Sequence, residues 1–320
     1  MVASAFDYVA ADSYDEAVRL LAANGDDAKI LAGGQSLMPM LNLRLAHPEL
    51  LIDINPADTR PPSVAGGVLR LPALTRHRVL IEDDLVRQHC PLLADAVRHV
   101  GNVRVRNRGT IGGSLAHADP TSEIGGCVLA AGAQVLARGP DGERAIPAQE
   151  LFAGYWTTAL DDGEIITDVL IPVARPRQGW SFHEMVRRTS DFAIVAVAAL
   201  VELDESGTAV TAARVALAGV ADRVTLADPE LAGLELAGLE LAGLELAGRA
   251  SGGDLDADPD AAVAAAAARI AGRLEPSDDV HASAAYRRRL AEVLTARALR
   301  QACARAARAA RAAGAAGAAG

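Results

Sequence analysis

Two glycine pairs, each in a predicted glycine-rich turn, constrain this chain more than any other feature. The first lies in Ala32-Gly33-Gly34-Gln35-Ser36, which follows a short predicted strand at 29–31. The second lies in Gly109-Thr110-Ile111-Gly112-Gly113-Ser114. Glycine has no Cβ atom, so it lets the main chain approach closely and adopt positive φ angles. Neither segment fits G-x-G-x-x-G or G-x-x-x-x-G-K-[ST], so a Rossmann fingerprint or a P-loop is not supported.

Local signals predict alternating helices and strands around these pairs. Ser13 and Glu16 have the spacing of a capping box, which predicts a helix start, and Gly25 predicts its end. Pro39 stands near the start of an apolar stretch, where a helix tolerates proline. Pro176 and Gly179 mark 172–179 as the best domain boundary. Further strands are predicted at 50–54, 134–137, 164–172, 191–202 and 209–218, and further helices at 92–100, 122–131, 261–274 and 284–309.

Two stretches have low complexity. Residues 230–248 repeat Glu-Leu-Ala-Gly-Leu every five residues. A period of five matches neither the 3.6 of a helix nor the 2 of a strand, so the repeat is interpreted as a surface-loop insertion without function. The Ala/Arg-rich end, 301–320, is expected to be a helix that frays into disorder.

Composition excludes several function classes. A formal net charge of −10 argues against a general nucleic-acid surface, which needs concentrated Lys and Arg. Cys90, Cys127 and Cys303 form no C-x-x-C pair, so no zinc or iron–sulfur site is expected. The sequence has no run of 18 apolar residues and no signal pattern at its start, which predicts a cytoplasmic protein without a membrane span.

The glycine pairs suit a dinucleotide, because its pyrophosphate needs main-chain N–H groups that approach closely. Ser36, Thr110 and Ser114 supply hydroxyl groups beside them. The alternative is that both pairs are ordinary tight turns between a strand and a helix. Arg104, Arg106 and Arg108 are predicted to line one face of a strand, near phosphate or a partner subunit, or simply in solvent.

Both segments resemble the FAD-binding loops of the middle subunit of molybdenum hydroxylases, the family of aerobic carbon monoxide dehydrogenase and xanthine dehydrogenase. The resemblance covers nearly the whole chain apart from the repeat and the tail. It rests on Ala32–Leu37 followed by Arg44-Leu45-Ala46 and Leu51-Ile52-Asp53-Ile54, on Arg106–Pro120, on Arg187–Ala193, and on Asp279–Ser283 with Tyr286-Arg287.

This resemblance implies an α+β fold with two domains and a tail. Residues 1–175 would form an FAD-binding domain of the vanillyl-alcohol-oxidase type (PCMH type), with subdomains at about 1–55 and 56–175. Residues 180–300 would form a small α+β domain like the C-terminal domain of carbon monoxide dehydrogenase flavoproteins, with three antiparallel strands and a helical bundle. The repeat 230–248 would interrupt this second domain, and 301–320 would be the partly disordered tail.

The resemblance also implies a set of FAD-binding residues, while it gives no catalytic residue and no metal ligand. The two glycine loops would hold the pyrophosphate, and Glu123 would accept hydrogen bonds from flavin hydroxyls. Phe192 would lie near the isoalloxazine ring, unless it is an ordinary core residue on a strand. Ile166 would offer backbone contacts to the cofactor. The full set is Ala32, Gly33, Gly34, Gln35, Ser36, Leu37, Thr110, Ile111, Gly112, Gly113, Ser114, Asp119, Glu123, Ile166 and Phe192.

The function that the resemblance implies is electron transfer within a larger oxidoreductase. An iron–sulfur small subunit would deliver electrons from a molybdenum large subunit, with two copies of each chain in the complex. The low aromatic content, 3%, agrees with a chain that does not line a pocket for an organic substrate itself. A self-sufficient FAD oxidase of the same superfamily and a non-enzymatic nucleotide-binding module are the alternatives. The substrate of the complex and its final electron acceptor stay open.

Overall fold

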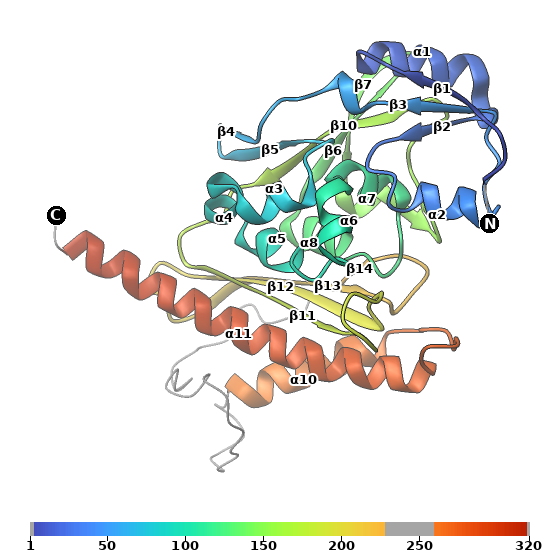
Figure 1. The fold of residues 1–320 in the computed structure, drawn as a ribbon. Helices are drawn as coiled ribbons and strands as arrows, with labels where there is room; N and C mark the ends of the chain where they lie inside the picture. Colours follow the sequence, from blue (N-terminus) through green and yellow to red (C-terminus); the bar gives the residue numbers. More distant parts are fainter. Residues whose placement is uncertain (1–2, 228–258, 319–320) are drawn as a thin grey trace. The chain divides into compact units, whose positions relative to one another are not determined.

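The computed structural model describes residues 3–227 and 259–318, so the repeat at 230–248 lies outside the described residues. The chain divides into two compact units (Figure 1). Unit 1 comprises residues 1–119 and 132–173, and unit 2 comprises residues 120–131 and 174–320. Each unit is described by itself below.

Unit 1 begins with a small parallel sheet. Its strand order is β1-β3-β2, and both pairings are parallel. Helix α1 packs on β2 and β3 through Ala17 and Val18. It starts where the sequence predicts, because the Ser13 side chain accepts a hydrogen bond from the Glu16 N–H, and Gly25 ends it at φ +53°. The elements are β1 (Asp7–Ala10), α1 (Tyr14–Asn24), the 3₁₀ turn Gly25–Asp27, β2 (Ala28–Leu31), α2 (Leu37–Asn42), β3 (Leu50–Asp53) and the 3₁₀ turn Asn55–Ala57.

A second, antiparallel sheet completes unit 1. Its strand order is β4-β5-β10-β6-β7, and a two-stranded ribbon, β8-β9, accompanies it. Short helices follow β5, and their apolar residues, such as Leu80, Leu93 and Leu115, are fully buried. The strands are β4 (Ser63–Ala65), β5 (Val68–Pro72), β6 (Gln134–Gly139), β7 (Gly142–Pro147), β8 (Phe152–Gly154), β9 (Thr157–Thr158) and β10 (Ile165–Pro172). The helices are α3 (His77–Glu82), α4 (Asp84–His89), α5 (Pro91–Ala96), α6 (Val103–Arg108), α7 (Ile111–His117) and α9 (Ala148–Leu151).

Unit 2 is a four-stranded antiparallel sheet packed against helices. Helix α11 crosses β11 and β12 with α10 beside it, and α8 lies against β12 and β13 (Figure 1). The sheet has one strand more than the three that the sequence analysis expects, because the short strand β14 pairs with β13. The elements are α8 (Glu123–Ala131), β11 (Gln178–Met185), β12 (Val195–Leu203), β13 (Val210–Ala218), β14 (Thr225–Ala227), α10 (Pro259–Gly272) and α11 (Ala284–Ala318).

The alanine-rich helix α11 packs unusually close to strand β11. A Cβ atom on Gly179 would lie 1.9 Å from the Ala302 carbonyl oxygen, so only glycine fits at this contact. The Ser181 hydroxyl donates to the Ala298 carbonyl oxygen over 2.8 Å. Ala302 and Cys303 are fully buried, so the beginning of the Ala/Arg segment that the sequence analysis sets apart from position 301 belongs to the core of unit 2.

The predicted strand through Arg104, Arg106 and Arg108 is wrong, because these residues form helix α6. The alternation of valine and arginine from Val103 imitates a strand, but the Asn102 side chain caps a helix by accepting from the N–H groups of Arg104 and Val105. Arg106 donates to the Val100 and Gly101 carbonyl oxygens, and the other two arginines are exposed. No helix of the described residues is both long and apolar enough to cross a membrane.

Candidate functional site

The two glycine segments, far apart in the sequence, come into contact within unit 1. A Cβ atom on Gly33 would lie 2.4 Å from the Arg108 carbonyl oxygen and 2.8 Å from the Cα atom of Gly109. A Cβ atom on Gly113 would lie 3.7 Å from the Ala32 Cβ atom. Gly33 is therefore required for the close approach of two backbones, and residues 32–36 and 109–114 form one site. We call these two segments the first and second glycine loops.

The first glycine loop contains main-chain donors that are not used within the described structure. Gly34 has φ +70°, a conformation that favours glycine, and the Gln35 side-chain amide donates to the Gly33 carbonyl oxygen over 3.0 Å. Within residues 3–227 and 259–318, the N–H groups of Gly33, Gly34, Gln35 and Ser36 meet no hydrogen-bond acceptor. Successive unpaired N–H groups of this kind form a nest for an anion such as a phosphate.

In the second glycine loop, the main-chain N–H groups of Ile111, Gly112 and Gly113 are hydrogen-bonded within the protein. The N–H of Ile111 donates to the Thr75 carbonyl oxygen over 3.0 Å, and that of Gly112 donates to the Ala73 carbonyl oxygen over 2.8 Å. The Gly113 N–H donates to the Thr110 hydroxyl oxygen, which caps helix α7. The prediction that Gly112 and Gly113 place their N–H groups against a pyrophosphate therefore disagrees with the structure, since both groups bond within the protein.

His77 lies buried behind the second glycine loop, 3% exposed. Its Nε2 atom is 3.0 Å from both the Thr110 carbonyl oxygen and the Ser114 hydroxyl oxygen. A carbonyl oxygen only accepts, so Nε2 carries the proton of a neutral ring. The pKa of His77 is lowered to about 4, mainly by burial and less by the charges of Arg106 and Arg76, against the opposing effect of the Thr110 bond. His77 thus supports the loop as a neutral donor.

Three residues of this site were not predicted from the sequence: His77, and Asn55 and Arg76, which join the two loops. Asn55 donates to the Ala32 carbonyl oxygen over 2.9 Å, and Arg76 donates to the Arg108 carbonyl oxygen and to the Asn55 side-chain oxygen. One signal pointed to Asn55, because it follows the carboxyl end of the parallel strand β3, where open α/β sheets bind ligands. Nothing local distinguishes Arg76 or His77 from other polar residues ahead of a helix.

The remaining predicted site residues are distributed over both units. Asp119 is half-buried at the end of the first part of unit 1, and Ile166 is 4% exposed in β10, next to a β-bulge. Glu123 is the first residue of α8 in unit 2. Phe192, also in unit 2, is 77% exposed and precedes β12, so the alternative of a core residue on a strand is wrong. Ser36 and Leu37 flank the start of α2 and are half-buried.

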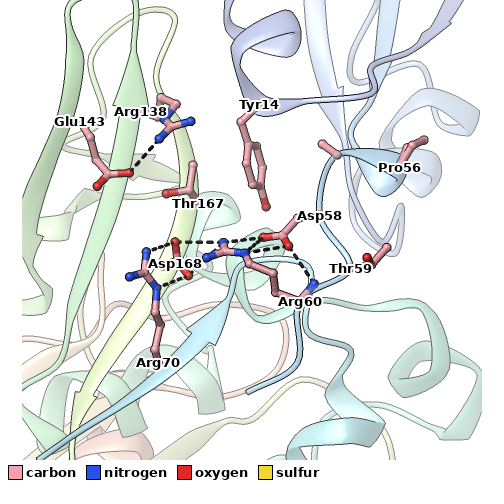
Figure 2. A pocket seen from close by; sticks show the side chains of 11 residues that line it. Tyr14, Pro56, Asp58, Thr59, Arg60, Arg70, Arg138, Glu143, Thr167 and Asp168 are labelled. Atoms are coloured by element: carbon pink, nitrogen blue, oxygen red, sulfur yellow. Dashed lines mark hydrogen bonds and ion pairs between the residues drawn. The ribbon is translucent and has the colours of Figure 1, made fainter. Parts of the chain in front are cut away.

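A polar cavity of 420 Å³ lies elsewhere in unit 1, and its side chains balance one another in charge (Figure 2). The buried Asp168 accepts two hydrogen bonds of 2.8 Å from Arg70 and two of 3.2 Å from Arg60. Arg60 also pairs with Asp58, whose pKa is lowered because the Arg60 bonds outweigh burial. Figure 2 shows the Tyr14 ring directed toward this cluster, and burial raises the pKa of Tyr14. We interpret the cluster as a connection between the segment after β3 and the sheet, because Arg60 and Asp168 are 108 residues apart.

Metal ligands do not converge in the part of the chain that the structure describes. No group of three or more His, Cys, Asp or Glu side chains there could hold a metal ion. The three cysteines form no disulfide bond and are buried, and burial raises the pKa of Cys90 to about 11 and of Cys303 to about 12. These thiols are therefore packed as apolar groups.

The fold and the glycine loops define a flavin-binding subunit. The family profile of the FAD-binding domain in molybdopterin dehydrogenase matches residues 4–174, and that of the C-terminal domain of carbon monoxide dehydrogenase flavoproteins matches residues 180–255 and 250–302. The chain belongs to the family of FAD-binding medium subunits of molybdenum hydroxylases. The family and the cofactor, FAD, are as the sequence analysis predicts, and so is an oxidoreductase that works as part of a complex.

Two relatives illustrate the similarity. The chain is 38% identical to the 6-hydroxypseudooxynicotine dehydrogenase complex subunit alpha of Paenarthrobacter nicotinovorans, over 94% of this chain and 95% of that one. It is 39% identical to the carbon monoxide dehydrogenase medium chain of Hydrogenophaga pseudoflava, over 69% of this chain and 77% of that one.

Solved structures share the mixed α/β fold, with an FAD-binding domain followed by a C-terminal domain. Carbon monoxide dehydrogenase from Hydrogenophaga pseudoflava matches with a TM-score of 0.83 at 35% identity, over 95% of this chain and 99% of that one. Quinoline 2-oxidoreductase from Pseudomonas putida 86 matches with a TM-score of 0.82 at 33% identity, over 95% of this chain and 98% of that one.

Proposed function

We propose that this chain transfers electrons within a molybdenum hydroxylase complex. It would take them from the iron–sulfur clusters of a small subunit and pass them to an external acceptor. Four adjacent N–H groups without acceptors among the described residues, at the meeting point of the two glycine loops, carry the proposal. Full-length similarity to subunits of multi-subunit dehydrogenases supports it.

The residues around the glycine loops fit the diphosphate part of FAD. The free N–H groups of residues 33–36 can each donate to a phosphate oxygen, and the Arg76 and Arg108 side chains supply positive charge nearby. The second loop contributes shape, since Gly112 lets it pack against Ala73 and Gly113 lets it lie beside Ala32 of the first loop. FAD, when bound, supplies the capacity to accept and release electrons one or two at a time.

Other residues are proposed to hold the rest of the cofactor. Glu123, at the start of α8, would accept hydrogen bonds from flavin hydroxyls. Ile166 would offer its backbone and Phe192 its ring to the isoalloxazine, and the exposure of Phe192 in unit 2 leaves its side chain available for such a contact. Asp119, Gln35, Leu37 and Ile111 complete the proposed set of contacts around the loops.

The proposed partners are an iron–sulfur small subunit and a molybdenum large subunit, with two copies of each chain, in the cytoplasm. Names of relatives support partners of this type, since they are a complex subunit and medium chains. The substrate would bind to the large subunit, so its identity is not encoded in this chain.

The decisive experiment isolates this chain with FAD and adds the chemically reduced iron–sulfur subunit without oxygen. We expect the visible absorbance of the flavin to bleach at least as fast as the complex turns over, on the order of 10 per second for an average enzyme. Bleaching far slower than turnover would rule out the electron-transfer role even if FAD binds. If an alcohol or a sugar reduced the FAD of the isolated chain without any partner subunit, that result would instead support the alternative of a self-sufficient oxidase.

A further inference from the structure

Two side chains that are hydrogen-bonded to each other link the peptide groups before Gly33 and Gly109. The Asn55 side-chain N–H group donates to the carbonyl oxygen of Ala32, the residue before Gly33. The Asn55 side-chain oxygen accepts from Arg76, whose other terminal nitrogen donates to the carbonyl oxygen of Arg108, the residue before Gly109. Two side chains therefore connect two loops that are more than 70 residues apart in the sequence.

The orientation of Asn55 is fixed by its neighbours. Its backbone N–H donates to the Asp53 carboxylate over 2.8 Å, and its side-chain N–H group donates to the same oxygen. Arg76 has only donors, so the side-chain oxygen of Asn55 must face it. Asp53 also accepts a 2.6 Å bond from the Tyr8 hydroxyl. Burial raises the pKa of Asp53, but the bonds from Tyr8 and Asn55 outweigh it and leave the pKa lowered, so the carboxylate stays charged at neutral pH.

Arg76 is a half-buried cation whose direct partners are neutral. Both of its hydrogen-bond acceptors are amide-type oxygens, and no carboxylate of residues 3–227 or 259–318 lies within ion-pair distance of it. Burial lowers its pKa, and the neighbouring Arg108 charge lowers it further, although an arginine remains protonated. A positive charge next to the free N–H groups of the first loop suits a diphosphate.

We propose that Asn55 and Arg76 are positioning residues for the diphosphate of FAD. By bonding to the Ala32 and Arg108 carbonyl oxygens at once, they hold the first glycine loop against the second, so that the free N–H groups converge on one anion. The inference rests on the proposed FAD site, and it states that Asn55 and Arg76 maintain the arrangement of the loops at that site.

The test is the affinity of the apoprotein for FAD in Asn55→Ala, Arg76→Gln and the double variant, measured by flavin fluorescence. Each single change should weaken binding about tenfold, the effect of losing one hydrogen bond to a charged partner. The double variant should bind FAD as tightly as the single variant with the lower affinity, because both residues act through one connection. Fully multiplying effects would overturn the proposal.

Arg144→Gln is the matched control. Arg144 also joins a carbonyl oxygen, that of Ala159, to a distant side chain, Glu164, within unit 1. It lies outside the glycine loops, so FAD affinity should stay within about twofold of the original, as expected for a distant surface ion pair. An equal loss in this control and in Arg76→Gln would overturn the positioning role.

Two further measurements distinguish a positioning role of Asn55 and Arg76 from a general effect on folding and from an effect of the Arg76 charge alone. Riboflavin lacks the diphosphate, so its affinity should be unchanged in Asn55→Ala, and an equal loss for riboflavin and FAD would refute the proposal. Arg76→Lys keeps the charge but cannot reproduce the two directed bonds, so full recovery of FAD affinity in it would refute positioning by this pair. Failure of the unmodified chain to bind FAD would instead refute the proposed function.

Discussion

The first and second glycine loops are similar in sequence and differ in physical role. In the first loop, Gly34 adopts a positive φ angle, and four neighbouring N–H groups have no acceptor among the described residues. In the second, the φ angles of Gly112 and Gly113 are ordinary for a helix start, and their N–H groups bond to Ala73 and Thr110. The first loop leaves its donors available for an anion, whereas the second uses its donors in contacts within the protein.

The difference shows that a glycine pair has no single meaning. Gly33 and Gly112 are required because a neighbouring backbone or side chain occupies the place of a Cβ atom. Gly34 is required because of its conformation, since a Cβ atom there would meet only the flexible side chains of Leu31 and Met38, both at 3.3 Å. The same residue type therefore predicts different losses at different positions, and these losses can be measured.

The largest effect is expected for Gly112→Val. A Cβ atom at this buried position would lie 2.5 Å from the Ala73 Cβ atom and 2.9 Å from the Ala73 carbonyl oxygen, and valine adds two more carbons. Overpacking of this kind, with the loss of the Gly112–Ala73 hydrogen bond, should cost about 3 kcal/mol or more of the free energy of unfolding. Chemical denaturation measures the loss, and the purified protein should be colourless.

Gly126→Ala is the control for that prediction. Gly126 lies in helix α8, and a Cβ atom there would meet nothing within 4 Å. Alanine favours a helix over glycine by about 1 kcal/mol, so this variant should be at least as stable as the original. A Gly112→Val protein with full stability and full FAD would show that the contact with Ala73 is misplaced.

The second prediction concerns pH and again separates the two loops. Protonation of His77 is disfavoured in the folded state, since its pKa is about 4 there against an ordinary value of 6.5. The unfolded chain therefore binds the proton first, and His77 makes stability fall as the pH drops from about 6.5 to 4. Above pH 6.5 His77 causes no such loss, and below pH 4 the loss of unfolding free energy reaches its full value of about 3 kcal/mol.

Comparison with His77→Gln isolates this effect, because carboxylates such as Asp53, Asp58 and Glu164 also lose stabilising bonds in acid. Glutamine can still donate to the Thr110 carbonyl oxygen but does not titrate. The stability difference between the two proteins should shrink or reverse below pH 6.5. A constant difference between pH 4 and 7 would show that the ring is not neutral behind the second loop.

Local signals explain what the sequence predicts well. Ser13, Glu16 and Gly25 define helix α1 because caps act on neighbouring N–H and carbonyl groups, and the strand β10 is visible from the alternation that ends at Pro172. Glycine pairs beside hydroxyl residues were enough to suggest a diphosphate site. These features depend on a few consecutive residues, which is why they can be inferred without the fold.

Contacts between distant segments explain what the sequence does not predict. Strand β11 was missed because Gly179 reads as a loop residue, whereas the structure requires glycine there for the approach of Ala302. The Gly112 N–H is used by Ala73, some 40 residues away, and Arg76 reaches Arg108 and Asn55. No local pattern records these pairings. The sequence therefore predicts neither that the Gly112 N–H group is already bonded nor that Arg76 belongs to the site.

Within the first loop, Gly33→Ala should have the larger effect of the two possible alanine changes. Its Cβ atom would lie 2.4 Å from the Arg108 carbonyl oxygen, which belongs to the backbone and cannot rotate away as a side chain can. The loops must separate to admit it, at a cost of about 2 kcal/mol of unfolding free energy. FAD affinity should fall more than tenfold, measured by titration of the apoprotein. Unchanged affinity would mean that contact between the loops does not shape the site.

Gly34→Ala should have the smallest effect, one residue further along the same loop. The change places a Cβ atom in a backbone with φ +70°, which costs about 1 kcal/mol for an ordinary residue, while the two side chains it meets can shift. The N–H groups stay in place, so FAD affinity should fall only a few fold. Gly34→Asn should lose less stability than Gly34→Ala, because asparagine tolerates the left-handed region better. If alanine at 34 proved as damaging as alanine at 33, backbone conformation rather than loop contact would control the site, and the distinction between the two glycines would fail.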